Sequence, residues 1–179
     1  MWYVIQTLST KESAVKDFIE RRVPKELYED CRIVYYETER KYQGAWHKEK
    51  KRMFPGYLFI ITEDPEALKP YLRRCPEMSK ILGIDGKPVP LLPHEELFIE
   101  KLTGGGDTVE MSIGTKVGDK VIVNQGFLQG RESSIRKIDR HKRKAWIEVD
   151  LLGETRIAEV GLEVVAKIKE EGNDTPKGE

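Results

Sequence analysis

Residues 103–115, TGGGDTVEMSIGT, divide the chain into two halves whose hydrophobic patterns differ. The segment contains four glycines, three of them consecutive, and has little apolar surface to bury, which is typical of a flexible linker. Before it, strand and helix patterns alternate; residues 116–168 show only short strand patterns separated by turns. We therefore expect two domains, at 1–102 and 116–168, joined by this linker and followed by a solvated tail at 169–179.

The beginning of the first half predicts a strand followed by a helix. Residues 2–8 are apolar and aromatic, as in a short strand. Ser9 stands three residues before Glu12, a capping-box arrangement that predicts the start of a helix, and Pro24 ends it.

The remainder of the first half predicts further strands and two more helices. Three strands are expected between residues 31 and 62, and a short one at 79–84. The pair Asp64 and Pro65 predicts a helix start, and Pro93 predicts another. The fold class is therefore α+β, with an antiparallel sheet flanked by helices.

The second half predicts a small β-barrel. The expected strands lie at residues 120–124, 132–138, 144–151, 154–160 and 163–166. Glycines separate these segments, among them Gly153 and Gly161. Short, evenly spaced strands with glycine turns are typical of a five-stranded barrel.

Composition excludes several classes of protein. Hydrophobic residues make up 39% of the chain and charged residues 35%, so it can bury a core. Two distant cysteines and three well-separated histidines support neither a metal site nor a disulfide framework. No apolar run is long enough for a membrane span, and no catalytic or nucleotide-binding signature is present. We expect a cytoplasmic, monomeric protein that is not an enzyme and needs no cofactor.

Several motifs together resemble the NusG family of transcription factors. The opening WYVIQTLSTKESAV is similar to the first strand and helix of that family's amino-terminal domain, and MFPGYLFI at residues 53–60 to a later strand. GKPVPLLPHEEL, at residues 86–97, resembles the segment that leads into its last helix. Residues 117–165 are similar to a KOW domain, an SH3-like barrel, although the third glycine that usually follows the pair Gly126 and Gly130 is missing.

The resemblance implies a binding protein that acts on RNA polymerase. It implies that the amino-terminal domain receives the tip of the clamp helices of the polymerase's largest subunit, closes the clamp and suppresses pausing. Carried over to this chain, the polymerase-binding residues are Trp2, Gln6, Phe54 and Tyr57. Since aromatic residues at strand spacing also form ordinary sheet cores, which of the four are exposed stays open.

A basic run in the second half points to nucleic acid. Residues 136–144, RKIDRHKRK, place six fixed positive charges against one carboxylate. This run resembles the specialised paralogues, especially the LoaP antiterminators, whose KOW domain binds RNA. We therefore expect contacts with nascent RNA in the form of a structured hairpin, because a basic hairpin tip of the protein attracts phosphates. The predicted RNA-binding residues are Lys120, Arg131, Arg136, Lys137, Arg140, His141, Lys142, Arg143, Lys144 and Trp146.

Trp146 enters this set through strand alternation. In KAWIEVDLL, Ile147, Val149 and Leu151 alternate with Trp146, so the tryptophan faces outward if the aliphatic side chains face the core. There it can stack on an unpaired base or pack against the linker or the other domain.

Two alternatives remain open at this point. A charge run at a hairpin tip is often only a solvated turn, and the KOW domain then binds a protein, such as ribosomal protein S10 or Rho, as in general NusG factors. The lysine-rich residues 48–52 lie near upstream DNA or simply protect a sheet edge.

Overall fold

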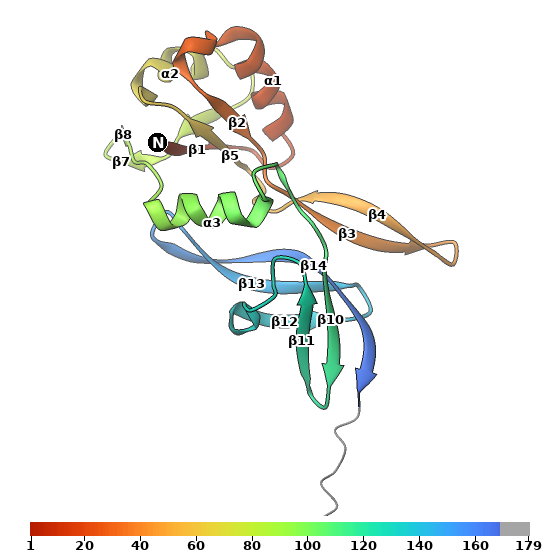
Figure 1. The fold of residues 1–179 in the computed structure, drawn as a ribbon. Coiled ribbons are helices and arrows are strands. Elements are labelled where there is room, and N and C mark those ends of the chain that lie inside the picture. Colours follow the sequence, from red (N-terminus) through yellow and green to blue (C-terminus); the bar gives the residue numbers. More distant parts are fainter. Residues whose placement is uncertain (169–179) are drawn as a thin grey trace, which may run out of the picture.

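The computed structural model describes residues 1–168, so the predicted tail at 169–179 lies outside the described residues. The chain is α+β, as predicted, with mostly antiparallel sheets and few helices. An upper, amino-terminal part carries the three α-helices, and a lower, carboxy-terminal part consists of strands (Figure 1).

The amino-terminal sheet has four strands in the order β2-β5-β1-β6, all antiparallel. Its strands are β1 (Trp2–Thr7), β2 (Asp30–Arg32), β5 (Tyr57–Ile61) and β6 (Ser79–Ile81). The helices are α1 (Glu12–Arg22), α2 (Pro65–Leu72) and α3 (Pro93–Thr103), with a short 3-10 turn at Lys25–Leu27 and a small ribbon of β7 (Gly83–Ile84) and β8 (Lys87–Pro88).

Strand alternation gives this sheet two different apolar faces. On one face, Ile5, Leu58 and Ile60 are fully buried and belong to a core that includes α1 and α2 residues such as Val15 and Leu68. The opposite face belongs to a second core, which continues through α3 into the carboxy-terminal strands. Because successive side chains of a strand point to opposite sides, a single stretch of sequence contributes to both cores.

One helix start is as predicted and another is not. Asp64 caps α2 by accepting a hydrogen bond from the Ala67 N–H at 3.1 Å, with Pro65 in the first turn. The capping box at Ser9 was wrong, because α1 begins after Lys11 without a side-chain cap. The Glu12 carboxylate is instead buried, where it accepts a hydrogen bond from the Gly56 N–H and pairs with Arg52 at 2.9 Å.

The region in which three strands were expected, residues 31–62, contains four, because the chain forms two strands before the turn at Gly44. After β2, the chain leaves the amino-terminal sheet and continues as β3 (Tyr35–Tyr42), which pairs with β4 (Ala45–Arg52) in a long hairpin. The base of β3 also pairs in parallel with β9 (Thr108–Val109). This β3–β4 hairpin extends to the side of the molecule, above the carboxy-terminal strands (Figure 1).

The carboxy-terminal sheet has five strands in the order β11-β10-β14-β13-β12 and is curled, which is consistent with the expected barrel (Figure 1). Its strands are β10 (Ser112–Val117), β11 (Lys120–Gln125), β12 (Ile135–Asp139), β13 (Lys144–Leu151) and β14 (Glu154–Ile168), with a 3-10 turn at Glu132–Ser134. The two separate strands predicted at 154–160 and 163–166 are one continuous strand, because Gly161 does not interrupt β14.

The predicted linker contains strand residues. Gly104 ends α3 in the left-handed conformation (φ 60°), but β9 and the beginning of β10 both lie within residues 103–115. β9 is held by β3, and the Tyr35 N–H donates to the Asp107 carbonyl at 2.7 Å. Glycine content alone indicated a loop, whereas pairing with a strand distant in sequence orders part of it.

Candidate polymerase and nucleic-acid interfaces

The residues predicted to bind polymerase share one face of the amino-terminal sheet. In the β1–β5 pairing, Gln6 lies opposite Tyr57, and Trp2 lies two pairs further along the same face. Phe54 precedes β5, and its ring centroid lies 5.7 Å from that of Phe59 on this face. Trp2 and Phe54 are only 4% and 6% exposed, whereas Gln6 and Tyr57 are half-buried.

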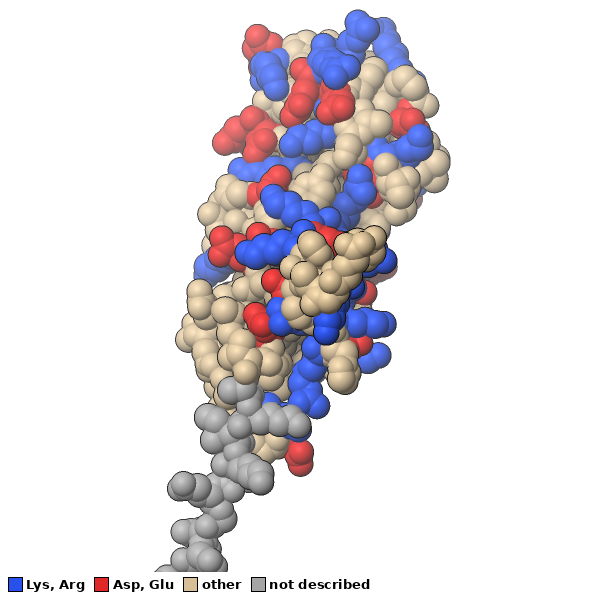
Figure 2. Space-filling view, turned by 90° about the vertical axis from the view of Figure 1, so that its right-hand side faces the viewer, with Lys and Arg blue, Asp and Glu red and all other residues tan. Residues whose placement is uncertain are grey.

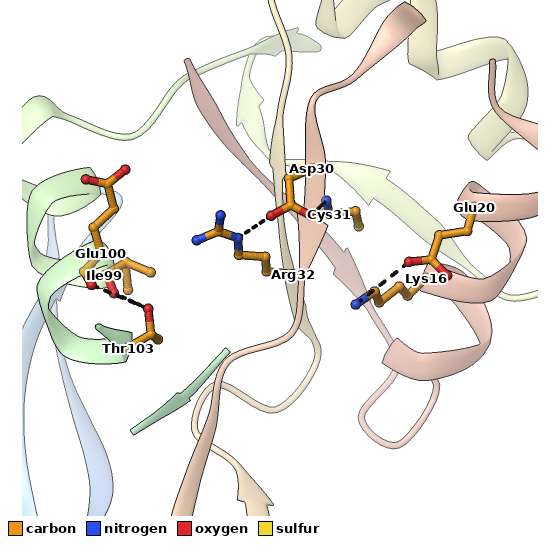
Figure 3. Close-up of polar contacts among 8 residues, drawn as sticks. All are labelled: Lys16, Glu20, Asp30, Cys31, Arg32, Ile99, Glu100 and Thr103. Atoms are coloured by element: carbon orange, nitrogen blue, oxygen red, sulfur yellow. Dashed lines mark hydrogen bonds and ion pairs between the residues drawn. The ribbon is translucent and has the colours of Figure 1, made fainter. Parts of the chain in front are cut away.

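An arginine from β2, which is separated from β1 by β5, lies over the indole of Trp2. The Arg32 guanidinium carbon lies 5.3 Å from the centre of the Trp2 ring. Asp30 holds this arginine by an ion pair to its Nε and also accepts a hydrogen bond from the Cys31 N–H at 2.8 Å (Figure 3). The Trp2 side of the sheet thus combines a buried indole with a cation held over it.

The carboxy-terminal sheet covers the other end of the same face. The Arg156 guanidinium of β14 lies 5.2 Å from the Tyr57 ring centre, and the Gly153 N–H donates to Glu95 of α3 at 3.0 Å. Phe98 of α3 meets Phe127 edge to face, with ring centroids 5.5 Å apart. In this arrangement, a partner that stacks on the ring face under Arg156 must displace Arg156, although the Tyr57 side chain is only half-buried.

Most of the predicted RNA-binding cations lie on one hairpin, formed by β12 and β13. Arg136, Lys137, Arg140, His141 and Lys142 are exposed. Within residues 1–168, Arg140, Lys142 and Lys137 form no ion pair, whereas Arg136 pairs with Glu148. Lys and Arg side chains lie around and below the β3–β4 hairpin on the face toward which it points, with acidic side chains among them (Figure 2).

The turn that presents these cations is organised by the one carboxylate of the run. Asp139 accepts a hydrogen bond from the Lys142 backbone N–H at 3.0 Å, and this bond holds the pKa of Asp139 below its ordinary value. Arg143 adopts a positive φ of 50°, which closes the turn before β13.

Trp146 faces away from the barrel core, as its alternation predicted. Ile147, Val149 and Leu151 are buried, whereas Trp146 is half-buried on the other side of β13. The Lys137 ammonium of β12 lies 5.0 Å from the centre of its ring. The tryptophan and lysine thus form a joint cationic and aromatic surface beside the basic turn.

Arg143 and Lys144, in contrast, turn back toward the amino-terminal part. Arg143 pairs with Glu39 of β3 and, at 3.0 Å, with Glu163 of β14, and its guanidinium carbon lies 3.9 Å from the centre of the Trp46 ring. Lys144 pairs with Glu159 at 2.9 Å. These two cations therefore already have anionic partners.

Glu159 also joins the two parts of the chain. Its carboxylate accepts a hydrogen bond from the Tyr36 hydroxyl of β3 at 2.7 Å. Burial by itself raises the pKa of Glu159, but the hydrogen bonds from Lys144 and Tyr36 outweigh it and leave that pKa below its ordinary value. Burial, followed by the bond to Glu159, raises the pKa of Tyr36.

Two residues of the predicted RNA-binding set lie apart from the turn. Lys120 begins β11, which stands at the opposite end of the strand order from β12. Arg131 lies over the Phe127 ring, 4.7 Å from its centre, near α3. The structure thus gathers the cations of residues 136–142 but not these two.

Comparison with known proteins identifies the family. Residues 1–100 match the sequence profile described as "Transcription termination factor nusG". The chain belongs to the NusG family. It is 29% identical over 175 residues to the transcription termination/antitermination protein NusG of Staphylococcus carnosus, an alignment that covers 93% of this chain and 95% of that protein.

Other NusG proteins show the same relationship. Staphylococcus aureus NusG is also 29% identical over 175 residues, with 93% of this chain and 95% of that protein covered. A solved structure described as "Domain interaction in Thermotoga maritima NusG" has a TM-score of 0.53 and 29% identity, covering 91% of this chain and 93% of that one. NusG-family proteins are transcription factors, and the similarity extends over both parts of the chain.

Sequence reasoning missed the residues that join the two parts of this NusG-family chain. Glu39, Trp46 and Glu159 are ordinary strand residues without a local motif, and nothing in the motif at residues 86–97 indicates that Glu95 binds Gly153. Gly161 was interpreted as a strand separator, but a Cβ atom there would lie 2.3 Å from the Glu37 carbonyl oxygen. The lack of a side chain lets β14 approach β3, a role that a single sequence does not reveal.

Other kinds of site find no support within residues 1–168. No group of three or more His, Cys, Asp or Glu residues there is placed to hold a metal ion, and no helix in that range is long and apolar enough to cross a membrane. Cys31 is buried, and burial raises the pKa of its thiol to about 12, which makes it a poor nucleophile.

Proposed function

We propose that this chain is a transcription processivity and antitermination factor. Its amino-terminal domain binds RNA polymerase, and its KOW domain binds nascent RNA. The observation that carries the RNA assignment is the β12–β13 hairpin, where Lys137, Arg140 and Lys142 are exposed without an ion-pair partner among the described residues and Trp146 lies beside them. Because we propose that the protein acts during transcription, we also propose that it is located in the cytoplasm.

Electrostatics supports a polyanionic partner for this hairpin. Cations close together without carboxylate partners repel one another in the free protein, and phosphates relieve that repulsion while releasing counterions. The half-buried ring of Trp146 offers a stacking platform for an unpaired base next to those cations. A hairpin RNA provides both phosphates and unpaired loop bases.

Polymerase binding fits the sheet face that contains Trp2 and Tyr57. A partner helix tip can pack on its aromatic surface once the carboxy-terminal sheet moves away from Tyr57. The KOW domain then stays tethered, and the tether raises the effective concentration of RNA near the polymerase. No catalytic step is required, because suppression of pausing follows from holding the clamp closed.

A protein partner for the KOW domain is the second candidate, as in a general elongation factor that binds ribosomal protein S10 or Rho. Exposed apolar side chains on the carboxy-terminal sheet favour it: Ile122, Ile157 and Val165 are 49%, 57% and 58% exposed. Apolar surface of this kind is characteristic of protein contacts rather than of phosphate contacts.

The deciding experiment is a salt titration of RNA hairpin binding by the full-length chain. We compare the wild type with Arg140→Ala/Lys142→Ala and with a matched control, Lys80→Ala/Lys87→Ala, which removes two exposed lysines from β6 and β8. Each lost phosphate contact reduces the slope of log affinity against log salt by about 1. We expect a reduction of about 2 in the turn variant and none in the control. Equal, weak binding by all three proteins would instead favour the protein partner.

A further inference from the structure

The tip of the β3–β4 hairpin makes contacts to Arg143 that match those of an RNA nucleotide. Trp46 presents the flat face of its indole to the guanidinium, at 3.9 Å, and Glu39 presents a carboxylate to the same group. In the β3–β4 pairing, Lys41 lies opposite Trp46 and Lys48 opposite Glu39, which places both contacts on one face of the hairpin. Stacking on a ring combined with pairing to an anion is also how arginine binds a base and its phosphate.

We propose that the β3–β4 hairpin is an internal mimic of RNA, in which Trp46 stands for a base and Glu39 for a phosphate. This inference rests on the proposed RNA-binding function and adds residues of the amino-terminal part, Glu39 and Trp46, that set its affinity. RNA that contacts Arg143 must displace the β3–β4 hairpin from it.

The surrounding contacts make this displacement feasible. The Arg143 and Glu39 side chains are 21% and 14% exposed, so the pair borders solvent and is open to competition by an anion. Lys144 has a similar arrangement, because its partner Glu159 is held by Tyr36 of the same β3 strand. Arg143 and Lys144 are therefore the two cations of the run whose charge is paired at the β3 interface, whereas Arg136 pairs with Glu148 within the β12–β13 hairpin.

Displacement of the hairpin has a consequence for the polymerase face. The Arg143 and Glu159 contacts hold β14 and β13 against β3, and the same β14 strand places Arg156 over Tyr57. RNA that binds Arg143 and Lys144 weakens the contact of β13 and β14 with β3, and Tyr57 then loses the cover of Arg156. By thermodynamic linkage, a ligand of the Tyr57 face raises RNA affinity by the same factor.

The test is RNA hairpin binding by full-length Glu39→Gln, compared with Glu49→Gln. Glu49 lies on the same hairpin and pairs with Lys51 at 3.7 Å, so the control removes the same charge without touching Arg143. Loss of an ion pair of this kind shifts the docking equilibrium, and we expect about three- to ten-fold tighter RNA binding for Glu39→Gln than for Glu49→Gln. Equal affinities in the two variants would overturn the mimic.

A second variant opens the interface without changing charge. Gly161→Ala places a Cβ atom against the Glu37 carbonyl oxygen, so β14 must move away from β3. We expect its RNA affinity to rise as well, together with faster exchange of the Gly153 amide proton, whose hydrogen bond crosses the interface. Faster Gly153 exchange with unchanged RNA affinity would show that docking does not compete with RNA.

The mimic and the RNA-binding function fail in distinguishable ways. If Arg140→Ala/Lys142→Ala loses RNA while Glu39→Gln and Glu49→Gln bind alike, the function stands and the mimic is wrong. If no variant differs from wild type at any salt concentration, the RNA-binding function itself is wrong. If Glu39 only holds the fold, Glu39→Gln lowers thermal stability and leaves RNA affinity equal to that of Glu49→Gln.

Discussion

The two faces of the amino-terminal sheet are covered in different ways. One face packs against α1 and α2 through apolar side chains, and its central residues Ile5, Leu58 and Ile60 have no exposed surface. The other face is covered by α3 and the carboxy-terminal sheet, where apolar contacts are accompanied by the hydrogen bond from Gly153 to Glu95 and by Arg156 over Tyr57. Further contacts of the carboxy-terminal sheet go to β3, where Glu39 pairs with Arg143 and Tyr36 donates to Glu159.

This difference indicates which contacts on the sheet a binding partner can replace. Removing an apolar cover exposes surface to water at a cost proportional to area, and nothing in solution compensates for it. Ionic contacts at the surface can be replaced by water, salt or a charged partner at a much smaller cost. The first face therefore maintains the fold, and at the second face we expect a partner to replace the polar contacts at the edge rather than the apolar core around α3.

The largest effect, on the free energy of unfolding, should follow from a change in the sheet face that packs against α1 and α2. Ile60→Ala leaves a cavity in that core and should lower the free energy of unfolding by about 2 to 5 kcal/mol, measured by urea denaturation. Leu97→Ala, at a position 49% exposed on α3, is the control and should change it little. Exchange of the Gly153 amide should stay as in wild type for both; a change with Ile60→Ala would show that the two faces are not independent.

An intermediate effect should follow at the α3 contact. Phe127→Ala removes the edge-to-face contact with Phe98, which contributes about 1 kcal/mol and holds the carboxy-terminal sheet on α3. We expect the undocked fraction to rise about five-fold, seen as a larger radius in small-angle scattering. Phe98→Ala should produce the same increase, since it removes the other half of the pair. If neither variant expands, the aromatic contact does not hold the two parts together.

The smallest effect should come from pH. The pKa of Glu159 is lowered on docking. The stabilisation of docking by its carboxylate is therefore complete at pH values above the ordinary pKa of 4.5 and is lost as pH falls through the lowered pKa. The pKa of Tyr36 is raised on docking. The stabilisation of docking by its hydroxyl is therefore complete at pH values below the ordinary pKa of 10.0 and is lost as pH rises through the raised pKa. We therefore expect docking, followed by scattering, to be constant between these limits and weaker outside them.

The acidic half of this prediction has a specific control. Glu159→Gln removes the titrating carboxylate, so its docking should be weaker than that of wild type at neutral pH and should change less on acidification. An identical acid response in both proteins would assign the effect to other carboxylates at the interface.

Local patterns predicted most elements of the fold, and contacts between distant segments account for the errors. Alternation in residues 144–151 predicted both the strand and the outward side of Trp146, because side-chain direction in a strand depends on the backbone alone. Ser9 matched a capping pattern, but Glu12 is bound by Arg52 and Gly56 from a distant segment. Likewise, β3 leaves the first sheet because its partners are β4 and β9.

In the candidate sites too, local patterns predicted some features, whereas contacts between distant segments decided the others. Trp2, Gln6 and Tyr57 share a face because of β1–β5 pairing, which the strand pattern anticipated only as a set of sheet residues. The sequence did not indicate that Arg156 covers Tyr57, since the two residues lie 99 positions apart in the chain. Coverage of a surface depends on the docking of two parts, for which one sequence contains no local signal.

The sequence by itself determined the family, the α+β class, the all-β second half and the concentration of six cations within residues 136–144. Only the tertiary structure decided which of these cations remain free. Arg143 meets Glu39 across 104 positions of the chain, whereas Arg140 and Lys142, a few residues away, extend into solvent. A residue's charge is a property of its own chemistry, but its neutralisation depends on what folding brings within a few ångströms of it.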